Sequence, residues 1–448
     1  MYKIHTIYMI GCGGVGYALL EVFNKEKLFN DAKFIIIEPR QIIDINGVMK
    51  NRQYIHIKTS LTRENHKQLL KDCEASSYII NVSVNVDSIM LLKHAKINNS
   101  FYIDTSLEQY QDFIHVNIDE ITNYEQFKKN NLYHQNLEAF KTIGKSRRTR
   151  IISGGMNPAF INEYTKRALV EYGKLKGIKL DKGNYAKLGF ELELKEVQVV
   201  EYDCQKMKVK STQNLFVSDW SPYGLMEEGG DLVMLSLNND DIKKLEKSYN
   251  LIKPNEGDKN THIRFIAERG IDLKRKSFTL DDKGNPFIFE GMLIPHSEII
   301  TMSEFFNYKG DSPSISYIYH PCEEAIRGLE FFRKNDYKIL PDFLTVRNKD
   351  VISGWDSICC LLKFKNGDNF IAGTICGVKD ARRMKFKSNA TVIQVAAFMV
   401  GAICWSLKNP SQGLNNAETI PNAFIFDMGE KYMGLSIKGK LVKNPFEV

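Results

Sequence analysis

Residues 6–16 read TIYMIGCGGVG, and this stretch decides the fold that we predict for the chain. An apolar run with the character of a strand leads directly into a glycine loop, and the residues that follow carry the apolar spacing of a helix. Gly11, Gly13 and Gly16 fill a G-x-G-x-x-G frame. The first glycine permits a tight turn, the second lets a pyrophosphate approach the backbone, and the third lets helix and strand pack closely. The stretch therefore indicates a dinucleotide-binding loop.

The residues after this loop favour a nucleotide site over a simple glycine turn between a strand and a helix. A second apolar strand at residues 33–37 ends at Glu38, 27 positions after Gly11. In a dinucleotide fold, a carboxylate at this place accepts both ribose hydroxyls of NAD. The carboxylate would repel the 2′-phosphate of NADP, although Arg40, two residues later, leaves NADP as a second candidate cofactor. We predict that NAD contacts the residues Gly11, Gly13, Gly14, Val15, Gly16 and Glu38.

The first 125 residues alternate between strand and helix patterns. Strands are expected at residues 54–57, 78–82 and 101–104, with helices at 63–73 and 87–96. Alternation at this spacing predicts a parallel, doubly wound sheet of the Rossmann type, with its ligand at the carboxyl ends of the strands.

Polar residues follow two of these strands, within residues 81–85 and 104–106. They either line the path from adenosine to nicotinamide or cap the next helices. We expect cofactor contacts from Ser83, Asn85, Asp104 and Thr105.

A sixth strand of the same sheet is expected at residues 151–152, ahead of a glycine turn and a helix over 159–170. Asn157 lies between the turn and this helix. Two interpretations stay open: its side chain caps the helix, or it faces the nicotinamide or the substrate.

The pattern changes after residue 175. Residues 190–194, 196–201 and 207–210 alternate at period two, which predicts a mainly antiparallel sheet with one wet face in a second, α+β domain. We divide the chain into an NAD-binding Rossmann domain (1–150), a substrate and catalytic domain (151–385), and a C-terminal helix and tail (386–448). The last part is expected to pack on the first domain or at a dimer interface. The polar residues 238–260 are predicted to be an exposed insertion.

Composition excludes several classes of protein. The 448 residues carry 61 basic and 54 acidic side chains, mixed along the chain, so nucleic acid is not an expected partner. The basic run at 145–150 is predicted to be a solvated loop.

The eight cysteines form no C-x-x-C pair and have no paired histidines, so we expect no metal site, no disulfide framework and a reducing, cytoplasmic location.

Residues 388–407 contain no charge, which raises the question of a membrane span. The segment includes Asn389, Thr391 and Gln394 and is followed by Lys408. A buried helix of a large domain or of a dimer interface is the better interpretation, and no membrane partner is expected.

Three acidic segments of the second domain suit a cationic amine. They contain Glu201 with Asp203, Trp220 with Glu227 and Glu228, and His296 with Glu298, the last pair predicted on one face of a strand. An indole face attracts an ammonium or iminium, and carboxylates add charge-assisted hydrogen bonds. Each segment also has a structural interpretation: a core tryptophan, a surface turn and a satisfied histidine.

Several segments together resemble homospermidine synthase, a branch of the saccharopine-dehydrogenase-like group. In order they lie at residues 11–16, 102–105, 157–158, 201–205, 219–221 with Glu228, 293–298, 317–322, 354–356 and 405–410. The resemblance implies that NAD takes a hydride from putrescine, ammonia leaves, a second diamine forms an imine, and the same nicotinamide returns the hydride. It implies a homodimer and transferase activity on putrescine and related polyamines.

The resemblance also implies roles for particular residues. Trp220 would stabilise the cation, His296 would shuttle protons, and Asn157 would fix the reacting nitrogen. The substrate-binding residues would be Glu201, Glu228, Glu298 and Asp356. Departures from the family's usual sequence around Trp220 and at Pro295 leave the diamine preference open.

An imine-reducing dehydrogenase of the carboxyspermidine or saccharopine type is the nearest alternative. It would need a basic pocket for a carboxylate, whereas the candidate segments are acidic. A catalytically silent NAD-binding protein is the alternative from another class.

Overall fold

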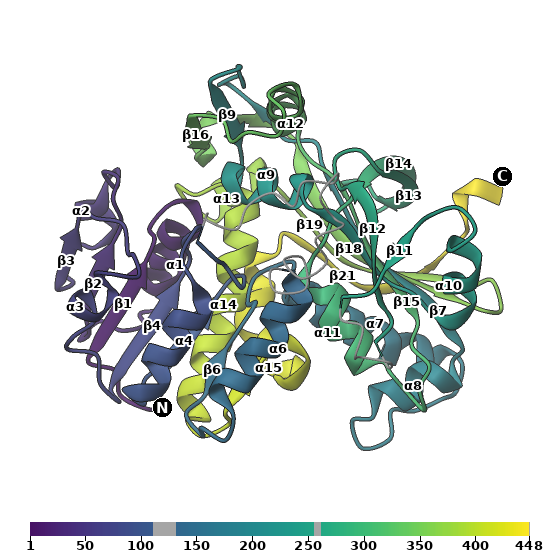
Figure 1. The fold of residues 1–448 in the computed structure, drawn as a ribbon, viewed down its shortest axis with the longest axis horizontal. Helices are drawn as coiled ribbons and strands as arrows, with labels where there is room; N and C mark the ends of the chain where they lie inside the picture. The colour runs from purple at the N-terminus through teal and green to yellow at the C-terminus, as the bar shows by residue number, and fades with distance from the viewer. Residues whose placement is uncertain (111–130, 255–260, 448) are drawn as a thin grey trace.

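A seven-stranded parallel sheet forms one side of the molecule in this computed structural model, which describes residues 1–110, 131–254 and 261–447 (Figure 1). The strand order is β20-β6-β5-β4-β1-β2-β3, so the direction of winding reverses between β1 and β4. The strands are β1 (Thr6–Ile10), β2 (Lys33–Ile37), β3 (Tyr54–Ile57), β4 (Ser77–Asn81), β5 (Phe101–Asp104), β6 (Arg150–Ile151) and β20 (Leu414–Asn415). This is the predicted doubly wound sheet, and the reversal point is where such sheets bind ligands.

Helices flank this sheet as the alternating pattern predicts. They are α1 (Gly14–Lys25), α2 (Ile45–Val48), α3 (His66–Leu69), α4 (Ser88–Ile97) and α6 (Leu132–Ile143). The helix predicted over 63–73 is wrong in length, because only His66–Leu69 is helical.

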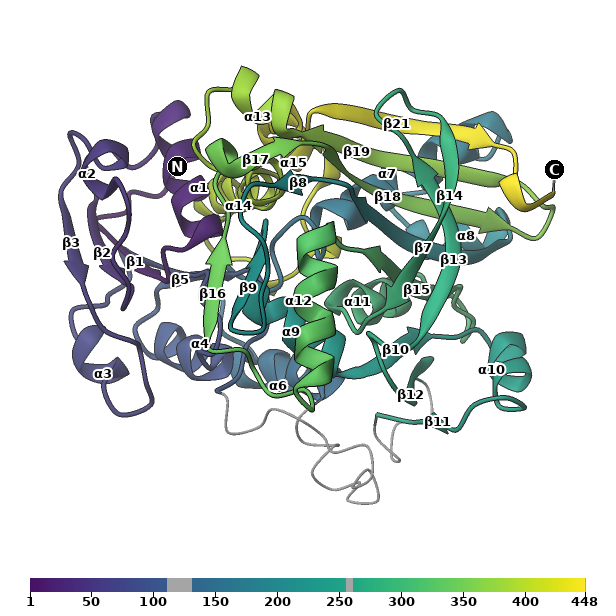
Figure 2. The same cartoon turned by 90° about the horizontal axis from the view of Figure 1, so that it is seen from above.

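A ten-stranded, mainly antiparallel sheet forms the other side. It confirms the predicted fold class; in its main strand path only β15 and β7 pair in parallel. Its strands are β7 (Leu194–Asp203), β10 (Leu232–Ser236), β11 (Leu251–Ile252), β12 (Ile263–Arg269), β13 (Lys274–Leu280), β14 (Pro286–Leu293), β15 (Ser314–His320), β18 (Trp355–Phe364), β19 (Asn369–Gly377) and β21 (Leu435–Val442). The hairpin of β13 and β14 lies off the main strand path and runs across other strands of the same sheet in the view of Figure 2.

Helices and two small sheets complete the second side. The helices are α7 (Phe160–Leu175), α8 (Tyr185–Glu191), α9 (Pro222–Gly230), α10 (Asn239–Leu245), α11 (Ser297–Phe305), α12 (Glu323–Lys334), α13 (Val378–Arg383), α14 (Ala390–Lys408) and α15 (Asn422–Gly429), with 3-10 turns η3 (Asn348–Asp350), η4 (Ala417–Thr419), η5 (Glu430–Tyr432) and η6 (Pro445–Glu447). The small sheets pair β9 (Leu215–Ser218) with β16 (Asp342–Thr345), and β8 (Lys206–Met207) with β17 (Val351–Ser353).

Two local predictions for this side are corrected. Residues 190–194 are not a strand, because α8 continues to Glu191 from an N-terminus that Asn184 caps through the backbone N–H of Lys187. The strand at 207–210 shortens to Lys206–Met207. The predicted exposed insertion contains α10 and the edge strand β11, and its residues 238–251 are partly or fully exposed; residues 255–260 lie outside the described residues.

Helix α14 lies between the two sheets (Figure 1). It packs against α1 and α15 and contacts strands of both sheets, β5 on one side and β18 and β19 on the other. The helix is long and apolar enough to cross a membrane, but 94% of its most apolar window is buried inside the molecule. The predicted buried helix is therefore confirmed.

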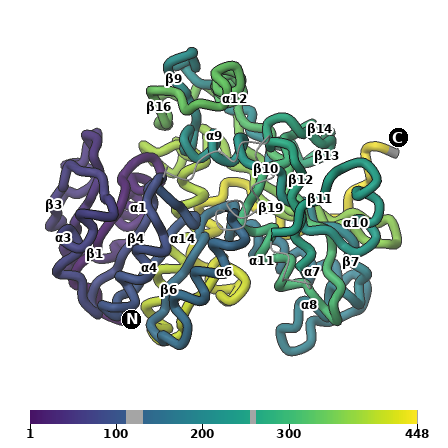
Figure 3. Tube along the Cα trace, in the orientation of Figure 1, coloured from purple at the N-terminus to yellow at the C-terminus, as the bar shows by residue number. Residues whose placement is uncertain are grey.

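The C-terminal segment contributes one strand to each sheet. Strand β20 pairs with β6, and β21 pairs with β19. The C-terminal segment is the yellow part of the trace in Figure 3. The division at residues 150 and 385 stays a prediction.

The basic run at 145–150 is more ordered than predicted. Arg150 is fully buried and donates from Nη2 to the carbonyl oxygen of Ala95 at 2.8 Å. The guanidinium of Arg148 lies over the rings of Tyr2 and Phe101. These side chains join α4 and β5 to the loop before β6.

Candidate active site

The glycine loop has the geometry of a phosphate cradle. Gly11 has φ +83°, and a Cβ there would lie 2.8 Å from Cα of Ser83. A Cβ on Gly16 would lie 2.9 Å from the carbonyl oxygen of Gly11. Beside Gly13 there is space, since a Cβ would meet only Nη2 of Arg40 at 3.4 Å. Helix α1 begins at Gly14 and has no side-chain cap at its N-terminus, so the loop fits a pyrophosphate group.

Glu38 lies directly after β2 and is almost fully buried. One carboxylate oxygen accepts from the backbone N–H of Cys12 at 3.0 Å, and the other accepts from the backbone N–H and Nε of Arg40 at 3.1 and 2.9 Å. Burial would raise the pKa of Glu38, but these hydrogen bonds together lower it, so the carboxylate is ionised. The carboxylate has the charge and position to accept hydrogen bonds from a ribose diol. The exposed Arg40 beside it leaves both NAD and NADP as candidate cofactors.

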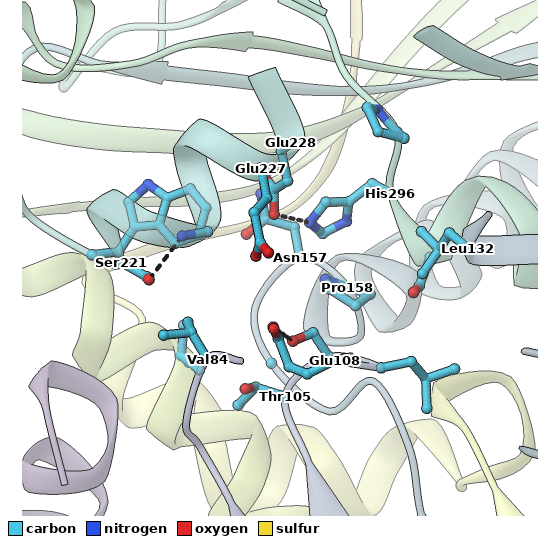
Figure 4. Close-up of a pocket in the computed structure, with 18 of the residues that line it drawn as sticks. Val84, Thr105, Glu108, Leu132, Asn157, Pro158, Ser221, Glu227, Glu228 and His296 are labelled. Atoms are coloured by element: carbon cyan, nitrogen blue, oxygen red, sulfur yellow. Dashed lines mark hydrogen bonds and ion pairs between the residues drawn. The ribbon is translucent and has the colours of Figure 1, made fainter. Parts of the chain in front are cut away.

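A cavity of about 280 Å³ lies between the carboxyl ends of the parallel strands and the second sheet (Figure 4). Of the predicted site residues, it is lined by Val15, Ser83, Thr105, Asn157, Glu201, Trp220, Glu228 and His296. These residues come from both sides of the molecule. The structure therefore brings the glycine-loop edge and the three acidic segments to one space.

His296 stands between two carboxylates. Its Nδ1 contacts Oε2 of Glu298 at very short range, and its Nε2 lies 3.6 Å from Oε1 of Glu228. Burial would lower the pKa of His296, but the two carboxylates raise it to about 10. The imidazole is therefore charged at neutral pH.

The prediction that His296 and Glu298 share a strand face is wrong. Strand β14 ends at Leu293, and His296 is the N-cap residue of α11, with Glu298 in its first turn. Pro295 has no N–H for a strand ladder, and an acidic residue in the first turn suits the helix dipole. The side chains still meet, across the helix start.

Asn157 does not cap a helix, because α7 begins at Phe160 with Ala159 at the N-cap. Its side-chain amide instead donates to Oε2 of Glu201 and to the hydroxyl of Tyr317, and the Tyr317 hydroxyl also donates to Glu201. Burial raises the pKa of Glu201 to about 8, against these hydrogen bonds and the charge of His296, which lower it. The capping interpretation is therefore wrong, and Asn157 belongs to a buried polar group at the cavity wall.

Trp220 lies at the start of α9 and is half-buried at the cavity wall. Its indole N–H donates to the hydroxyl of Tyr319 at 2.9 Å, and its backbone carbonyl accepts from the hydroxyl of Thr345 at 2.8 Å. Two contacts thus hold the indole at the wall of the cavity.

The cavity wall is acidic. Its charged residues are Glu108, Glu201, Glu227, Glu228 and Asp231, together with His296, and no Lys or Arg is among the described residues that line it. Burial raises the pKa of Glu108 to about 6, and burial beside Glu108 and Asp231 raises that of Glu227. Glu108 and Asp231 were missed from the sequence, since neither stands in a motif, and Glu227 was noticed only as the neighbour of Glu228.

Besides the four glycines of the loop and Glu38, four predicted site residues do not line the cavity. Glu298 is buried behind His296. Asp104 accepts from the hydroxyl of Tyr102 and the backbone N–H of Ser153, both at 2.7 Å, and so joins β5 to the turn after β6. The backbone N–H of Asn85 donates to Glu108 at 3.3 Å. Their roles stay predictions.

Asp356 is the fourth. It lies on β18 directly opposite Asp203 of β7, in a fully buried group that also holds Asp219. Asp203, Asp219 and Cys322 have ligand atoms within 4.8 Å of one another. Burial and neighbouring acids raise the pKa values of Asp203 and Asp356, and Thr391, which lines the cavity, donates to Asp219 at 2.7 Å. Asp356 therefore lies one layer behind the cavity wall.

Comparison with known proteins places this chain beside one group of enzymes. Residues 7–146 match the family model described as "Saccharopine dehydrogenase NADP binding domain". Over 96% of its length the chain is 23% identical to homospermidine synthase of Blastochloris viridis, covering 89% of that protein. It is 22% identical to that of Mesorhizobium japonicum, covering 97% of this chain and 89% of the relative.

Solved structures agree on the fold. Homospermidine synthase of Legionella pneumophila, solved in complex with NAD, matches with a TM-score of 0.83 at 22% identity, over 98% of this chain and 92% of that one. Apo saccharopine dehydrogenase (L-Glu forming) of Saccharomyces cerevisiae matches with a TM-score of 0.52 at 10% identity, over 98% and 100%. The resemblance to homospermidine synthase and the predicted fold class are both confirmed.

Proposed function

We propose that this chain is an NAD-dependent homospermidine synthase, which transfers an aminobutyl group between two diamines. One observation carries the proposal: an acidic cavity with a tryptophan in its wall opens onto the edge of the dinucleotide fold. The full-length similarity to homospermidine synthases supports it.

The cavity suits a substrate with a positive charge at each end. Glu201 and Glu228 line the same cavity as His296, and Glu108 and Glu227 add two more carboxylates. A diammonium ion would ionise these acids as it binds, because its positive charges lower the carboxyl pKa values that burial raises. Putrescine is the smallest substrate of this kind that the resemblance implies.

The face of Trp220 would stabilise the cation that forms when a carbon beside nitrogen loses a hydride. This attraction reaches about 2 kcal/mol where water is excluded. A bound nicotinamide would supply the acceptor and the later donor of that hydride. The glycine loop and Glu38 fit the pyrophosphate and ribose of the dinucleotide, and we propose NAD on account of the carboxylate.

His296 and Glu228 are proposed to manage protons. Only a neutral amine can release hydride, so a bound ammonium must first lose a proton. Nε2 of His296 and Oε1 of Glu228 lie 3.6 Å apart and would pass one between them on closing to hydrogen-bonding distance, and Glu298 holds the other ring nitrogen. Asn157, whose amide N–H groups point to Glu201 and Tyr317, has its carbonyl oxygen available to accept from a substrate nitrogen.

The test is incubation of the purified protein with putrescine and a catalytic amount of NAD. Homospermidine and ammonia are expected in equal amounts, with no net change in NADH absorbance at 340 nm. Failure to form both products would refute the proposal. Spermidine offered in place of one putrescine will show whether it can also donate the aminobutyl group.

An imine-reducing dehydrogenase is not favoured, because a substrate carboxylate would face five acids and no Lys or Arg among the described residues of the cavity wall. Such an enzyme would consume NADH or NADPH in proportion to product. A silent dinucleotide-binding protein would bind NAD and release neither product.

We also propose a homodimer in the reducing cytoplasm. The eight cysteines, all free and seven of them buried, support a reducing location. Light scattering after gel filtration tests the dimer, and fractionation of the cells of origin tests the location.

A further inference from the structure

Strand β15 brings two tyrosine hydroxyls to the groups proposed for catalysis. Tyr317 and Tyr319 are two positions apart, so they point to the same face of the sheet. Their rings are stacked, with centroids 5.8 Å apart and planes at 11°, and both are almost fully buried. Glu201 lies opposite Tyr319 on the paired strand β7 and faces the same way. Of the two adjacent rings, Tyr317 therefore lines the cavity, and the hydroxyl of Tyr319 contacts Trp220 in its wall.

The two hydroxyls hold different partners. That of Tyr317 donates to Glu201 and accepts from the amide of Asn157, and its ring lies edge-on to that of His296 at 4.9 Å. That of Tyr319 accepts the indole N–H of Trp220 at 2.9 Å. One tyrosine thus contacts the carboxylate and amide, and the other contacts the aromatic wall.

We propose that Tyr317 and Tyr319 are positioning residues with separate tasks, Tyr317 favouring the ionised form of Glu201 and orienting it with Asn157, and Tyr319 fixing the plane of the Trp220 indole. The proposal rests on the function given above. The two hydroxyls should affect turnover differently. Loss of the Tyr317 hydroxyl should shift the pH profile, because a carboxylate titrates, whereas loss of the Tyr319 hydroxyl should not, because an indole does not titrate.

The surroundings of Glu201 make its ionisation sensitive to one hydrogen bond. The groups that face it from the packed elements are Asn157, Asp203, Asp219, Glu228, His296, Tyr317, Tyr319 and Asp356. Four of these eight groups are carboxylic acids, whose negative charge disfavours that of Glu201, and the Tyr317 hydroxyl is one of the few donors that favour it. Loss of this donor would raise the pKa of Glu201, so a higher pH would be needed to ionise it.

The first experiment measures kcat/KM for putrescine against pH in the wild type and in Tyr317→Phe. The acid limb of the profile is expected to move upward by about 1 to 2 pH units, as for the loss of a hydrogen bond to a charged group. In a Glu201→Gln background the same substitution should no longer move the limb, since the titrating group is gone. An unmoved limb in the single variant would overturn the task given to Tyr317.

The second experiment uses Tyr319→Phe. We expect kcat to fall about tenfold with the acid limb unmoved, and no further fall when the change is made on Trp220→Phe, which has no N–H to hold. A loss of equal size in that background would overturn the task given to Tyr319.

Tyr202→Phe is the matched control. Tyr202 lies on β7 with its side chain on the opposite face, stacked on His320 with ring centroids 4.5 Å apart. It should leave both kcat and the pH profile unchanged. NAD binding and the melting temperature of each variant show that it is folded. If wild type makes no homospermidine, the proposed function fails; if wild type is active and the variants behave alike, only this inference fails.

Discussion

The charge on His296 depends on its two neighbours rather than on its burial. An isolated imidazole in this position would be neutral, because burial lowers its pKa, but Glu298 and Glu228 raise it to about 10. Its positive charge offsets one of the cavity acids before any substrate arrives. The cavity wall therefore holds one fixed cation beside acids whose pKa values burial raises.

Trp220 gives a prediction at this scale. Trp220→Ala should lower kcat by about 30-fold, corresponding to about 2 kcal/mol of cation–π stabilisation, and change the Kd of NAD by less than twofold. The measurements are steady-state turnover and calorimetric titration of NAD. Equal losses in both would show that the indole supports the fold of the cavity and does not stabilise a cation.

Glu201 gives a pH prediction. The pKa of this buried carboxyl is raised to about 8, so most of it is protonated at pH 7, and a bound ammonium would drive the proton off. The affinity for putrescine should therefore rise as pH increases from 6 to 8 and then level off.

Calorimetry without NAD checks this prediction. At pH 7 the apparent binding enthalpies in phosphate and in Tris should differ, because the buffer takes up the released proton. Glu201→Gln should reduce the difference. The same enthalpy in both buffers for the wild type would contradict the prediction.

At the scale of elements, two glycines of the loop have different tasks: Gly16 is needed for the fold, and Gly13 is needed for binding the dinucleotide. A Cβ on Gly13 has room in the protein, whereas one on Gly16 would clash with the Gly11 carbonyl oxygen. Gly13→Ala should therefore keep its melting temperature within about 2 °C and lose NAD affinity by at least tenfold, since the methyl group would stand where the pyrophosphate approaches.

Gly16→Ala is the comparison, and it should lose both stability and affinity. Differential scanning calorimetry and NAD titration give the two readings. Full NAD affinity in Gly13→Ala would place the pyrophosphate elsewhere.

The elements of the first sheet were predictable because each strand is a short apolar run beside a turn, and strands β1 to β6 were placed within one or two residues. Short period-two runs were less reliable. Residues 190–194 alternate like a strand but belong to a helix and the turn after it, and His296 with Glu298 lies across a helix start. Five residues with alternating polarity satisfy both patterns, and only distant packing decides between them.

The site was predictable where residue type and motif coincided. Trp220, His296, Glu201 and Glu228 line one cavity, together with Asn157 and with Val15 of the glycine loop. Glu108 and the role of Tyr317 were not predictable, because each depends on which strand lies beside which. Tyr317 meets Glu201 across 116 positions of sequence, through the parallel pairing of β15 with β7.

At the scale of the molecule, α14 ties the two sheets together, so unfolding should be a single transition. Phe398 is fully buried on this helix, and its ring lies 6.2 Å from that of Phe160. Phe398→Ala should lower the free energy of unfolding by about 3 to 5 kcal/mol while far-UV circular dichroism and tryptophan fluorescence still change together in denaturant.

Leu137→Ala, at a position 41% exposed on α6, is the control and should change stability by less than about 0.5 kcal/mol. Separate transitions by the two probes would show that the sheets unfold independently.

The placement of α14 and β20 also bears on synthesis of the chain. The apolar face of α1 is covered by a helix that begins at Ala390, and the edge beside β6 is completed only at Leu414–Asn415. During synthesis on the ribosome, strands β1 to β6 of the parallel sheet are therefore translated long before α14 and β20, which cover α1 and the sheet edge. The nucleotide-binding sheet therefore exposes apolar surface that chaperones can bind until residues 390–415 have been translated.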